Sequence, residues 1–485
     1  MCIRDSTSLV NADSLLAIDV GEINTRVILF DVVEGRYKFI ASGVAPTTVN
    51  APLNDIWEGI RIAIDRLQAI TGRSLVSEDE QLIIPSQADG SGVDKIAATL
   101  SAGKPLKVVA VGLLEDVSLE SSHRLATTTY AQVLDRIGLN DRRKMEERIN
   151  AIQRLRPDLI VIAGGIDGGA TQSVLRLIEP ILLANYLLPE EERAEILFAG
   201  NQSLSEEMKD TYAKYGTIYV APNVRPTLEV EHLDTVQVHL ANTFRRIRCK
   251  QIPGVLELDK AVEDRLMPTT MAMGRIINFL SQVYGSVKGV LGVDIGASAT
   301  SLALAYSGTL KLGVYPQFGL GESLKDLLSY CPIGDIVRWL SLDIPIDYVR
   351  DYLSNKALYP ASIPATQEDV ELEQALARQM LRLSIRQMSS SNLEIRKYLD
   401  NEMVLGCEPV VVGGSVLTNA PKYSQTLLVL LDGLQPIGVT TFVLDQRNLL
   451  PALGVAAALN PILVIQTLES GALLNLGTVI SPVGE

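Results

Sequence analysis

A seven-residue pattern occurs twice in the chain, each time between two apolar, strand-like runs. The first copy is DVGEINT at 19–25, and the second is DIGASAT at 294–300. Each copy places a glycine two positions and a threonine six positions after an aspartate. A third strand-like run follows each copy, so both halves of the chain open with a three-strand meander. A pattern repeated in the same setting indicates a duplication, and we therefore expect two related halves.

After the meanders, strand-like runs alternate with helix-like stretches, which predicts an α/β architecture. In the first half, apolar and polar residues do not alternate in the runs around 108–113 and 159–163. Such runs are typical of strands that helices cover on both faces. The small-residue stretch 451–459 predicts a closely packed helix rather than a ligand contact.

The repeated turn has the residue types of a phosphate-binding hairpin. A tight turn presents several backbone N–H groups on one side, and glycine lets a ligand approach the backbone closely. Hydroxyl groups donate to phosphate oxygens, and an aspartate at a strand end is a ligand that Mg²⁺ prefers. A single D-x-G turn is equally typical of an ordinary hairpin. Two copies favour a clamp on a polyphosphate, built from Asp19, Gly21, Thr25, Asp294, Gly296, Ser298 and Thr300, with Asp19 and Asp294 as metal ligands.

Composition excludes several classes of function. The 57 acidic and 43 basic residues give a net charge of −14, which disfavours binding to nucleic acid. No apolar run reaches the roughly 20 residues of a membrane helix, so no membrane association is expected. The polar segment 1–14 lacks the apolar core of a secretory signal and is expected to be a disordered or extraneous leader. The four cysteines are scattered, which favours a reducing, cytoplasmic location.

The two meanders resemble those of the actin-like ATPase superfamily, which includes actin, heat-shock chaperones and sugar kinases. The resemblance implies a duplicated ribonuclease-H-like fold, with ATP and Mg²⁺ in a cleft between the two halves. It matches 15–32 and 290–306 to the two phosphate loops, and 451–459 to a helix that crosses between the halves. The turn Gly413, Gly414 and Ser415 matches the glycine pair beside the adenosine.

On this fold, the chain divides into a first half, a helical connection, a second half and a tail. The first half is expected at 15–225 and the helical connection at 226–288. The second half is expected at 289–460, with a helical insertion at about 322–404, and the C-terminal tail at 461–485.

A narrower resemblance is to the glutamate mutase L family. It rests on the stretch AGGIDGG at 163–169 and on five shorter stretches in matching order, at 45–49, 221–226, 292–300, 412–417 and 476–484. The family is encoded beside adenosylcobalamin-dependent mutases. The resemblance therefore implies an ATP-using, chaperone-like factor that reactivates or protects such a mutase, with the mutase as its protein partner.

Both phosphate loops depart from the family pattern. Glu22, Ile23 and Asn24 replace small hydroxyl residues, and Arg26 replaces a lysine next to the nucleotide. The second loop has Ala297, Ala299 and Ser301 in place of glycine, threonine and aspartate. A glutamate facing a triphosphate repels it unless a cation lies between them. Weak ATP hydrolysis, a non-hydrolysing scaffold that binds a protein partner, and a small-molecule kinase all remain open as alternatives.

Catalysis would need a carboxylate, and two aspartates are candidates. Asp294 closes the first strand of the second meander, and Asp167 lies in the glycine-rich stretch. Either could act as a general base or hold a metal-bound water. For Asp167 a plain alternative is equally consistent with the sequence: a strand-to-helix turn in which the glycines permit tight packing.

Overall fold

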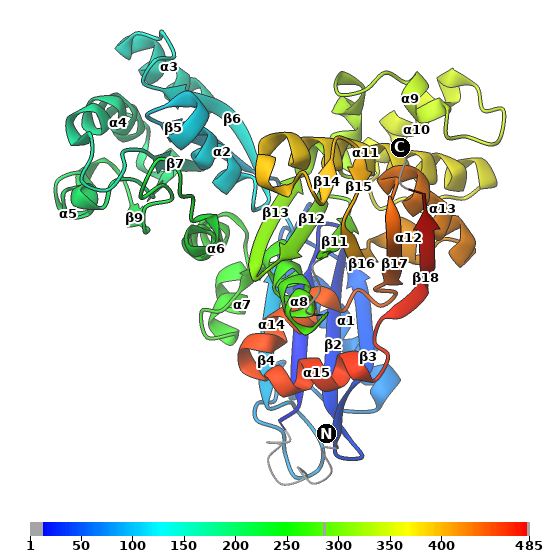
Figure 1. Cartoon of the computed structure of the whole chain (residues 1–485). Coiled ribbons are helices and arrows are strands. Elements are labelled where there is room, and N and C mark those ends of the chain that lie inside the picture. Colours follow the sequence, from blue (N-terminus) through cyan, green and yellow to red (C-terminus); the bar gives the residue numbers. More distant parts are fainter. Residues whose placement is uncertain (1–12, 285–287, 483–485) are drawn as a thin grey trace. The chain divides into compact units, whose positions relative to one another are not determined.

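The structure is a computed structural model that describes residues 13–284 and 288–482 (Figure 1). Most of the expected leader 1–14, the end of the helical connection and the last three residues of the tail lie outside this part. The chain folds into two compact units. Unit 1 comprises the described residues up to Gly103, those of Cys249–Gly308 and those from Gln317 onward. Unit 2 comprises Lys104–Arg248 and Thr309–Pro316.

Unit 1 contains two mixed sheets, and the first has the order β10-β4-β1-β2-β3. Strand β1 runs antiparallel to β2, β2 antiparallel to β3, and β1 parallel to β4. The helix α1 (Ile56–Thr71) begins at Asp55, whose side chain accepts from the Trp57 N–H, and buries one apolar face against β3. The strands are β1 (Leu15–Val20), β2 (Asn24–Val33), β3 (Arg36–Pro46), β4 (Lys95–Leu100) and β10 (Met267–Pro268).

The second sheet of unit 1 contains the strands β12, β11, β16, β17 and β18 in that order. Strand β11 runs antiparallel to β12 and parallel to β16, which is parallel to β17. A further strand, β13 (Thr309–Tyr315), follows β12 in the chain and completes the second meander. The bounds are β11 (Gly289–Ile295), β12 (Thr300–Tyr306), β16 (Cys407–Gly413), β17 (Gly438–Leu444) and β18 (Leu474–Ser481).

The two sheets share one plan and one register. Asp19 pairs with Arg26 across β1 and β2, as Asp294 pairs with Ser301 across β11 and β12. In each sheet a later strand adds parallel to the first strand on its other side. A meander with a parallel strand beside its first strand is the arrangement of a ribonuclease-H-like half. Its occurrence twice confirms the duplicated α/β fold expected from the sequence.

Two helices of unit 1 pack closely: α8 (Thr269–Tyr284), in the expected helical connection, and α14 (Leu450–Leu459), in the second half. A methyl group added at Gly454 would lie 2.0 Å from the Ala272 carbonyl oxygen, so only glycine permits this approach. Arg275 Nη1 donates to the Gly454 carbonyl at 3.0 Å. The expectation of close helix packing at 451–459 is confirmed.

Three of the remaining helices of unit 1, α9 to α11, lie between β12 and β16 in the chain (Figure 1). Helix α11 is the longest and begins with a capping box at Thr366 and Asp369. A short hairpin, β14 (Leu399–Asp400) and β15 (Met403–Val404), follows it. The helices are α7 (Val255–Ala261), α9 (Gly334–Val337), α10 (Ile346–Leu358), α11 (Gln367–Ser391), α12 (Ser415–Thr418), α13 (Tyr423–Leu434) and α15 (Pro461–Glu469).

Unit 2 is built on a parallel sheet of order β6-β5-β7-β8-β9. Strands β5 (Leu106–Gly112) and β7 (Leu159–Ala163) are almost fully buried, as their continuous apolar runs predict. The other strands are β6 (Ala131–Gly138), β8 (Glu195–Phe198) and β9 (Ile218–Val220). The helices are α2 (Glu120–Ala126), α3 (Met145–Leu155), α4 (Thr171–Tyr186), α5 (Ser205–Asp210) and α6 (Leu233–Gln251), whose end enters unit 1.

Candidate functional site

Unit 1 contains a cavity of about 770 Å³, a typical size for a small-molecule site. Both hairpin turns line it, together with the turns after β16 and β17, the start of α8 and the segment between α10 and α11. The cavity brings together most of the residues selected from the sequence: Asp19, Gly21, Arg26, Asp294, Gly296, Ser298, Gly413, Gly414 and Ser415.

The two hairpin turns close in the same way. The Gly21 N–H donates to the Asn24 carbonyl at 3.0 Å, and the Gly296 N–H donates to the Ala299 carbonyl at 2.9 Å. A methyl group at Gly21 would lie 2.9 Å from the Asn24 oxygen, and one at Gly296 would lie 3.2 Å from the Ala299 oxygen. Any larger residue would therefore press on the turn. Closure of the turn itself therefore favours glycine at both positions, which is a different reason from the close approach of a ligand expected from the sequence.

The second turn offers free backbone donors. Within the described part of the chain, the N–H groups of Ala297 and Ser298 have no hydrogen-bond acceptor. Both residues line the cavity. Successive unpaired N–H groups in a turn form a concave site for an anion. The presence of alanine at 297 and 299, in place of the family's glycine and threonine, therefore leaves the backbone part of a phosphate site intact.

The two repeated threonines lie beneath the turns and not in the cavity lining. Thr47 Oγ1 donates to the Gly21 carbonyl at 2.8 Å, so the proton of Thr25 Oγ1 is directed to Thr47 Oγ1, 2.9 Å away. Thr300 Oγ1 donates to the Phe318 carbonyl at 2.6 Å. Both threonines are fully buried. In this structure their hydroxyl groups therefore brace the turns, which differs from the phosphate donation expected from the sequence.

Three aspartates and one arginine line the cavity. Asp19 Oδ1 accepts from Thr99 Oγ1 at 2.6 Å and from Thr269 Oγ1 at 3.3 Å. Asp445, at the end of β17, accepts from the N–H groups of Leu449 and Leu450, one on each oxygen. Asp294 has no hydrogen-bond donor among the residues the structure describes, so both of its oxygens remain available to a ligand.

Burial and mutual repulsion set the protonation of these carboxyl groups. Burial raises the pKa of Asp294 to about 6, Arg26 opposes this rise, and Asp19 and Asp445 add to it. Burial also raises the pKa of Asp445 to about 6, although its two backbone donors and Arg26 favour the ionised form. Arg26 is thus the cation shared by these three aspartates. Perturbed carboxyl groups that line a cavity are typical of functional sites.

The glycine turn after β16 lies against the second hairpin. Gly414 has a φ of 98°, and a methyl group there would lie 2.2 Å from the Ile295 carbonyl oxygen. A methyl group at Gly413 would lie 3.2 Å from Asp294 Oδ1. The two glycines therefore let this turn approach β11 and leave room around the Asp294 carboxylate.

Glu22 departs from the family pattern, and its carboxylate contacts a neighbouring loop. Its Oε2 accepts from the Gly103 N–H at 2.8 Å, and its Oε1 lies 3.4 Å from Asn50 Nδ2. Glu22 nevertheless lines the cavity and adds negative charge to it. The contact with Gly103 explains how a glutamate is accommodated in the turn.

Asp167 lies in unit 2, in the glycine-rich turn between β7 and α4, and does not line the cavity described in unit 1. Its Oδ1 accepts from the Gln202 N–H at 3.0 Å and from Asn223 Nδ2 at 2.9 Å. Gly165 and Gly168 have positive φ angles, as a tight turn requires. These contacts favour the plain strand-to-helix turn over a catalytic role at the cavity of unit 1.

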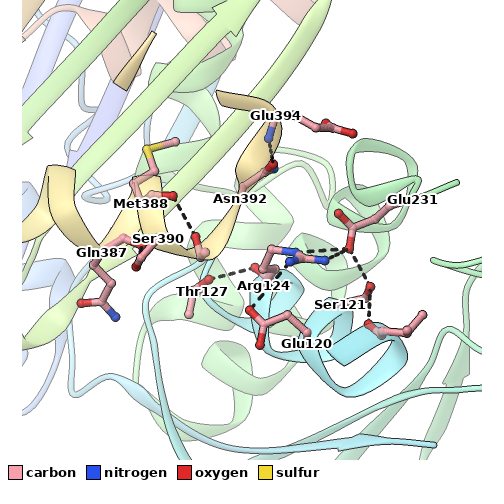
Figure 2. A network of polar contacts seen from close by, with 12 residues as sticks. Glu120, Ser121, Arg124, Thr127, Glu231, Gln387, Met388, Ser390, Asn392 and Glu394 are labelled. Atoms are coloured by element: carbon pink, nitrogen blue, oxygen red, sulfur yellow. Dashed lines mark hydrogen bonds and ion pairs between the residues drawn. The ribbon is translucent and has the colours of Figure 1, made fainter. Parts of the chain in front are cut away.

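A second polar cluster in unit 2 has a structural explanation. Figure 2 shows Arg124 and Ser121 of α2 donating to Glu231 Oε1, each at 2.6 Å. Burial alone would raise the pKa of Glu231, but Arg124 and Ser121 hold it below its ordinary value. Arg225 adds a second guanidinium 3.5 Å away. The cluster fastens the loop after β9 to α2.

Sequence reasoning missed several polar residues of the cavity, among them Lys356, Glu373, Gln374 and Asp445. Asp445 carried a usable signal, because it closes an apolar strand-like run as Asp19 and Asp294 do. The other three come from helices whose sequence shows only amphipathic periodicity. In the described residues no group of three or more His, Cys, Asp or Glu side chains has the spacing of a metal centre. No helix in the described ranges is long and apolar enough to span a bilayer.

Comparison with known proteins identifies the relatives of the chain. Residues 15–471 match the family model described as MutL protein. The chain is 24% identical to Protein MutL of Clostridium tetanomorphum over 387 aligned residues. The alignment covers 76% of this chain and 76% of that protein.

Solved structures give weaker likenesses. Nucleotide-free acetone carboxylase has a TM-score of 0.36 and 13% identity over 92% of this chain and 70% of the other. The nucleotide-free diol dehydratase-reactivating factor has a TM-score of 0.32 and 10% identity over 92% and 99%. Component A of (R)-2-hydroxyglutaryl-CoA dehydratase from Acidaminococcus fermentans has a TM-score of 0.28 and 10% identity over 92% and 97%. At these scores the likenesses carry no functional argument.

Proposed function

The chain belongs to the MutL protein family, and we propose that it is an ATP-binding accessory factor that reactivates or protects an adenosylcobalamin-dependent mutase. The observation that carries the proposal is the pair of equivalent hairpin turns that line one cavity of unit 1. Two anion-binding turns at one cavity suit a polyphosphate held from both sides. The choice of an adenosylcobalamin-dependent mutase as the partner rests on the family resemblance.

The residues of the cavity fit a magnesium nucleotide. The free N–H groups of Ala297 and Ser298 suit phosphate oxygens, and Arg26 supplies a positive charge beside the first turn. Asp294 is the better candidate for the metal, because Asp19 and Asp445 already accept hydrogen bonds from the fold. When bound, Mg²⁺ would offset the repulsion between the carboxylates and the phosphates. The protein would orient the nucleotide and exclude water from the cavity.

The proposed mechanism is a change of cleft opening. Phosphates held by both turns would link the two sheets of unit 1, so occupancy would favour a closed arrangement over an open one. Loss of the terminal phosphate would remove one set of contacts and release the closure. That change would alter the surface offered to the mutase. The cycle requires hydrolysis or exchange of the nucleotide, and for hydrolysis we propose Asp294 as the carboxylate that assists a water.

A thermal-shift series tests nucleotide binding. A ligand at 100 times its Kd adds about 2.7 kcal/mol to the free energy of unfolding. We expect ATP with Mg²⁺ and ADP with Mg²⁺ to raise the melting temperature, and AMP or Mg²⁺ alone to leave it nearly unchanged. No shift at millimolar ATP with Mg²⁺ would rule out the proposal. Phosphate release measured in parallel separates binding from turnover.

The accessory role needs its own assay. An adenosylcobalamin-dependent mutase inactivated by turnover is mixed with the protein, ATP, Mg²⁺ and fresh cofactor. We expect recovery of mutase activity that depends on ATP, and none with the protein omitted. If the protein binds nucleotide but restores no activity to any mutase of this class, the proposed partner class is wrong.

A non-hydrolysing scaffold is the second candidate. It is favoured by Ser301, which stands opposite Asp294 where the family has an aspartate, and by the negative charge of Glu22. A melting-temperature shift with ATP but no phosphate release, in the presence and absence of a mutase, would select this alternative. A small-molecule kinase would instead release ADP only when an acceptor is added.

A further inference from the structure

The connection between α10 and α11 exposes three large apolar side chains within six residues. Leu358, Tyr359 and Ile363 are 72%, 69% and 85% exposed, and we call them the apolar patch. Single exposed apolar residues are ordinary on a protein surface, but a cluster of them is typical of an interaction site. In the part of the chain that the structure describes, no other stretch of six residues exposes three large apolar side chains to this extent.

The inner side of the same connection belongs to the cavity. Residues 360–364 line it, and the Ser362 carbonyl accepts from Lys356 Nζ at the end of α10. Lys356 is buried and also pairs with Glu373 of α11, with 2.7 Å between Nζ and Oε1. The connection is therefore fixed to α11 through groups that line the cavity, while its outer side exposes the apolar patch.

Two carboxylates share the exposed stripe of α10 that leads to the patch. Asp347, Asp351 and Leu358 follow one another at helical spacing on this stripe, and all three are exposed. Neither aspartate forms an ion pair with another described residue. Like charges four residues apart weaken a helix, so the stability of α10 does not explain them. Arg350 is the only exposed cation of this helix.

The charge beside the patch selects the kind of partner. A second copy of the chain would bring the same carboxylates and a net charge of −14 against it. A nucleic acid or an anionic lipid surface would be repelled in the same way. A different protein that offers an apolar groove between basic side chains would match both the apolar side chains and the acidic stripe.

We propose that the apolar patch is the docking surface for the adenosylcobalamin-dependent mutase, which would receive it in an apolar groove flanked by basic side chains. The inference rests on the proposed function and adds the surface through which the partner binds. Residues 360–364 carry part of the patch and also line the cavity, so the nucleotide and the mutase would act on one segment. Each would then change the affinity for the other by the same factor.

A binding assay with the purified mutase of the reactivation assay tests the docking surface. Mutase affinity for the immobilised full chain is measured with ATP and Mg²⁺ and without nucleotide. Leu358→Ser combined with Tyr359→Ser, at positions outside the cavity lining, should weaken mutase binding at least about tenfold. Leu358→Met combined with Tyr359→Phe keeps the apolar area and should bind within about twofold of the wild type. The wild-type affinity should differ at least about fivefold between the two nucleotide states.

Tyr423→Ser combined with Leu428→Ser on α13 is the matched control. These two side chains are about half exposed, belong to unit 1 and do not line the cavity. The control should keep the mutase affinity of the wild type. Each double variant should also keep the melting temperature and the shift that ATP with Mg²⁺ produces, which shows that the fold and the cavity are intact.

A charge variant tests the acidic stripe. Asp347→Asn combined with Asp351→Asn should slow the association of the mutase at low salt and make its rate less dependent on salt, because charges at the rim of an interface act mainly on association. An association rate with the wild-type salt dependence would contradict a basic surface on the mutase.

The outcomes separate this inference from the proposed function. Wild-type mutase affinity in Leu358→Ser with Tyr359→Ser, or an equal loss in the α13 control, would overturn the docking surface, while recovery of mutase activity with ATP would still support the proposed function. A change in self-association of the chain, with mutase affinity kept, would identify a contact between copies and also overturn it. Equal wild-type affinity with and without nucleotide would overturn the link to the cavity.

Two results would bear on the nucleotide as well. Mutase binding that the Leu358 and Tyr359 variant loses, by a wild type that shows no melting shift with ATP and Mg²⁺, would support the docking surface and overturn the nucleotide function. A wild type that binds neither mutase nor nucleotide would overturn both proposals.

Discussion

Arg26 stands directly opposite Asp19 across β1 and β2, with its Nη1 3.8 Å from Asp19 Oδ2. The equivalent position in the second half is Ser301, opposite Asp294. The duplicated hairpins therefore differ in charge: the first carries an internal cation and the second does not. Arg26 also opposes the rise in the pKa of Asp294 and Asp445. A polyphosphate entering this cavity would compete with three carboxylates for one guanidinium.

Replacement of Arg26 should weaken nucleotide binding. Arg26→Ala removes the positive charge beside the first turn, and we expect an affinity loss of about tenfold or more, which corresponds to about 1.4 kcal/mol. Arg26→Lys should retain most of the affinity, because the charge remains. Calorimetry with ADP and Mg²⁺ measures the affinity of the wild type and of each variant. Arg61→Ala on α1, where the exposed side chain pairs with Glu58 and Glu80, is the control. Wild-type affinity in Arg26→Ala would contradict a role at the phosphates.

Neutralising Glu22 should strengthen nucleotide binding. Glu22→Gln keeps an oxygen that can accept from the Gly103 N–H but removes one negative charge from the cavity lining. We expect an affinity gain of roughly 2- to 10-fold for ATP at low salt, shrinking as salt screens the repulsion. A titration at two ionic strengths measures it. Affinity that is unchanged or lower at low salt would show that Glu22 lies too far from the phosphates to repel them.

The Asp294→Asn variant should change how stability depends on pH. In the wild type the pKa of Asp294 is raised to about 6, so its ionisation destabilises the folded state at neutral pH. The stabilisation from proton binding is complete below the unfolded pKa and is lost as the pH rises through about 6. We expect the variant to be more stable than the wild type at pH 8, by at most about 2–3 kcal/mol.

The difference between Asp294→Asn and the wild type should shrink between pH 6 and pH 4 and vanish below it, because both side chains are then neutral. Urea unfolding in the absence of nucleotide at several pH values measures this. Asp432→Asn on α13 is a control, since Asp432 does not line the cavity and pairs with Arg378. A constant difference at all pH values would show that Asp294 is not the titrating group.

Gly414 should tolerate substitution less than another glycine of positive φ. Gly414→Ala places a methyl group 2.2 Å from the Ile295 carbonyl oxygen, in addition to the strain of a φ of 98°. We expect a loss of about 3 kcal/mol or more in the free energy of unfolding. Gly438→Ala has a similar φ of 86° with no atom near the added methyl group, and should cost only about 1 kcal/mol. If Gly414→Ala and Gly438→Ala lose the same free energy of unfolding, the turn after β16 can move away from Ile295 at little cost.

A pair of hydroxyl variants separates bracing from ligand contact. Thr300→Val removes the hydroxyl that donates to the Phe318 carbonyl and should cost about 1–3 kcal/mol in stability. Its nucleotide affinity should stay within about twofold of the wild type, when both are measured well below the melting temperature. Ser298→Ala, at the cavity surface, should show little loss of stability and a weaker affinity for ATP. The reverse result would restore Thr300 as a phosphate contact.

The fold was predictable because its evidence is local and repeated. The pattern at 19–25 recurs at 294–300 with the same register of strand pairing, so the duplicated architecture follows from a short stretch of sequence. The continuous apolar runs of β5 and β7 likewise predict strands covered on both faces. Neither inference needs long-range packing.

The site was predictable only in part, because several of its contacts depend on distant residues. Thr47, which accepts from Thr25, lies 22 residues from it, and Phe318, which accepts from Thr300, lies 18 residues from it, so both partners lie outside the repeated pattern. Their roles cannot be deduced from the hairpin pattern alone. Gln374 and Glu373 lie on an amphipathic helix where polar residues are usually solvated, and only the packing of α11 buries them at the cavity.

The interruption of unit 1 by unit 2 has a consequence for synthesis on the ribosome. The stretch 104–248 is continuous and holds a complete parallel sheet, so it can begin folding while later residues are still being made. The first sheet of unit 1 is covered in part by α14 and α15, which pack on β1, β4 and β3 and lie near the end of the chain. The first meander therefore stays partly uncovered until almost the whole chain has emerged. Chaperones that shield apolar surface during translation would have the most to protect in the first hundred residues.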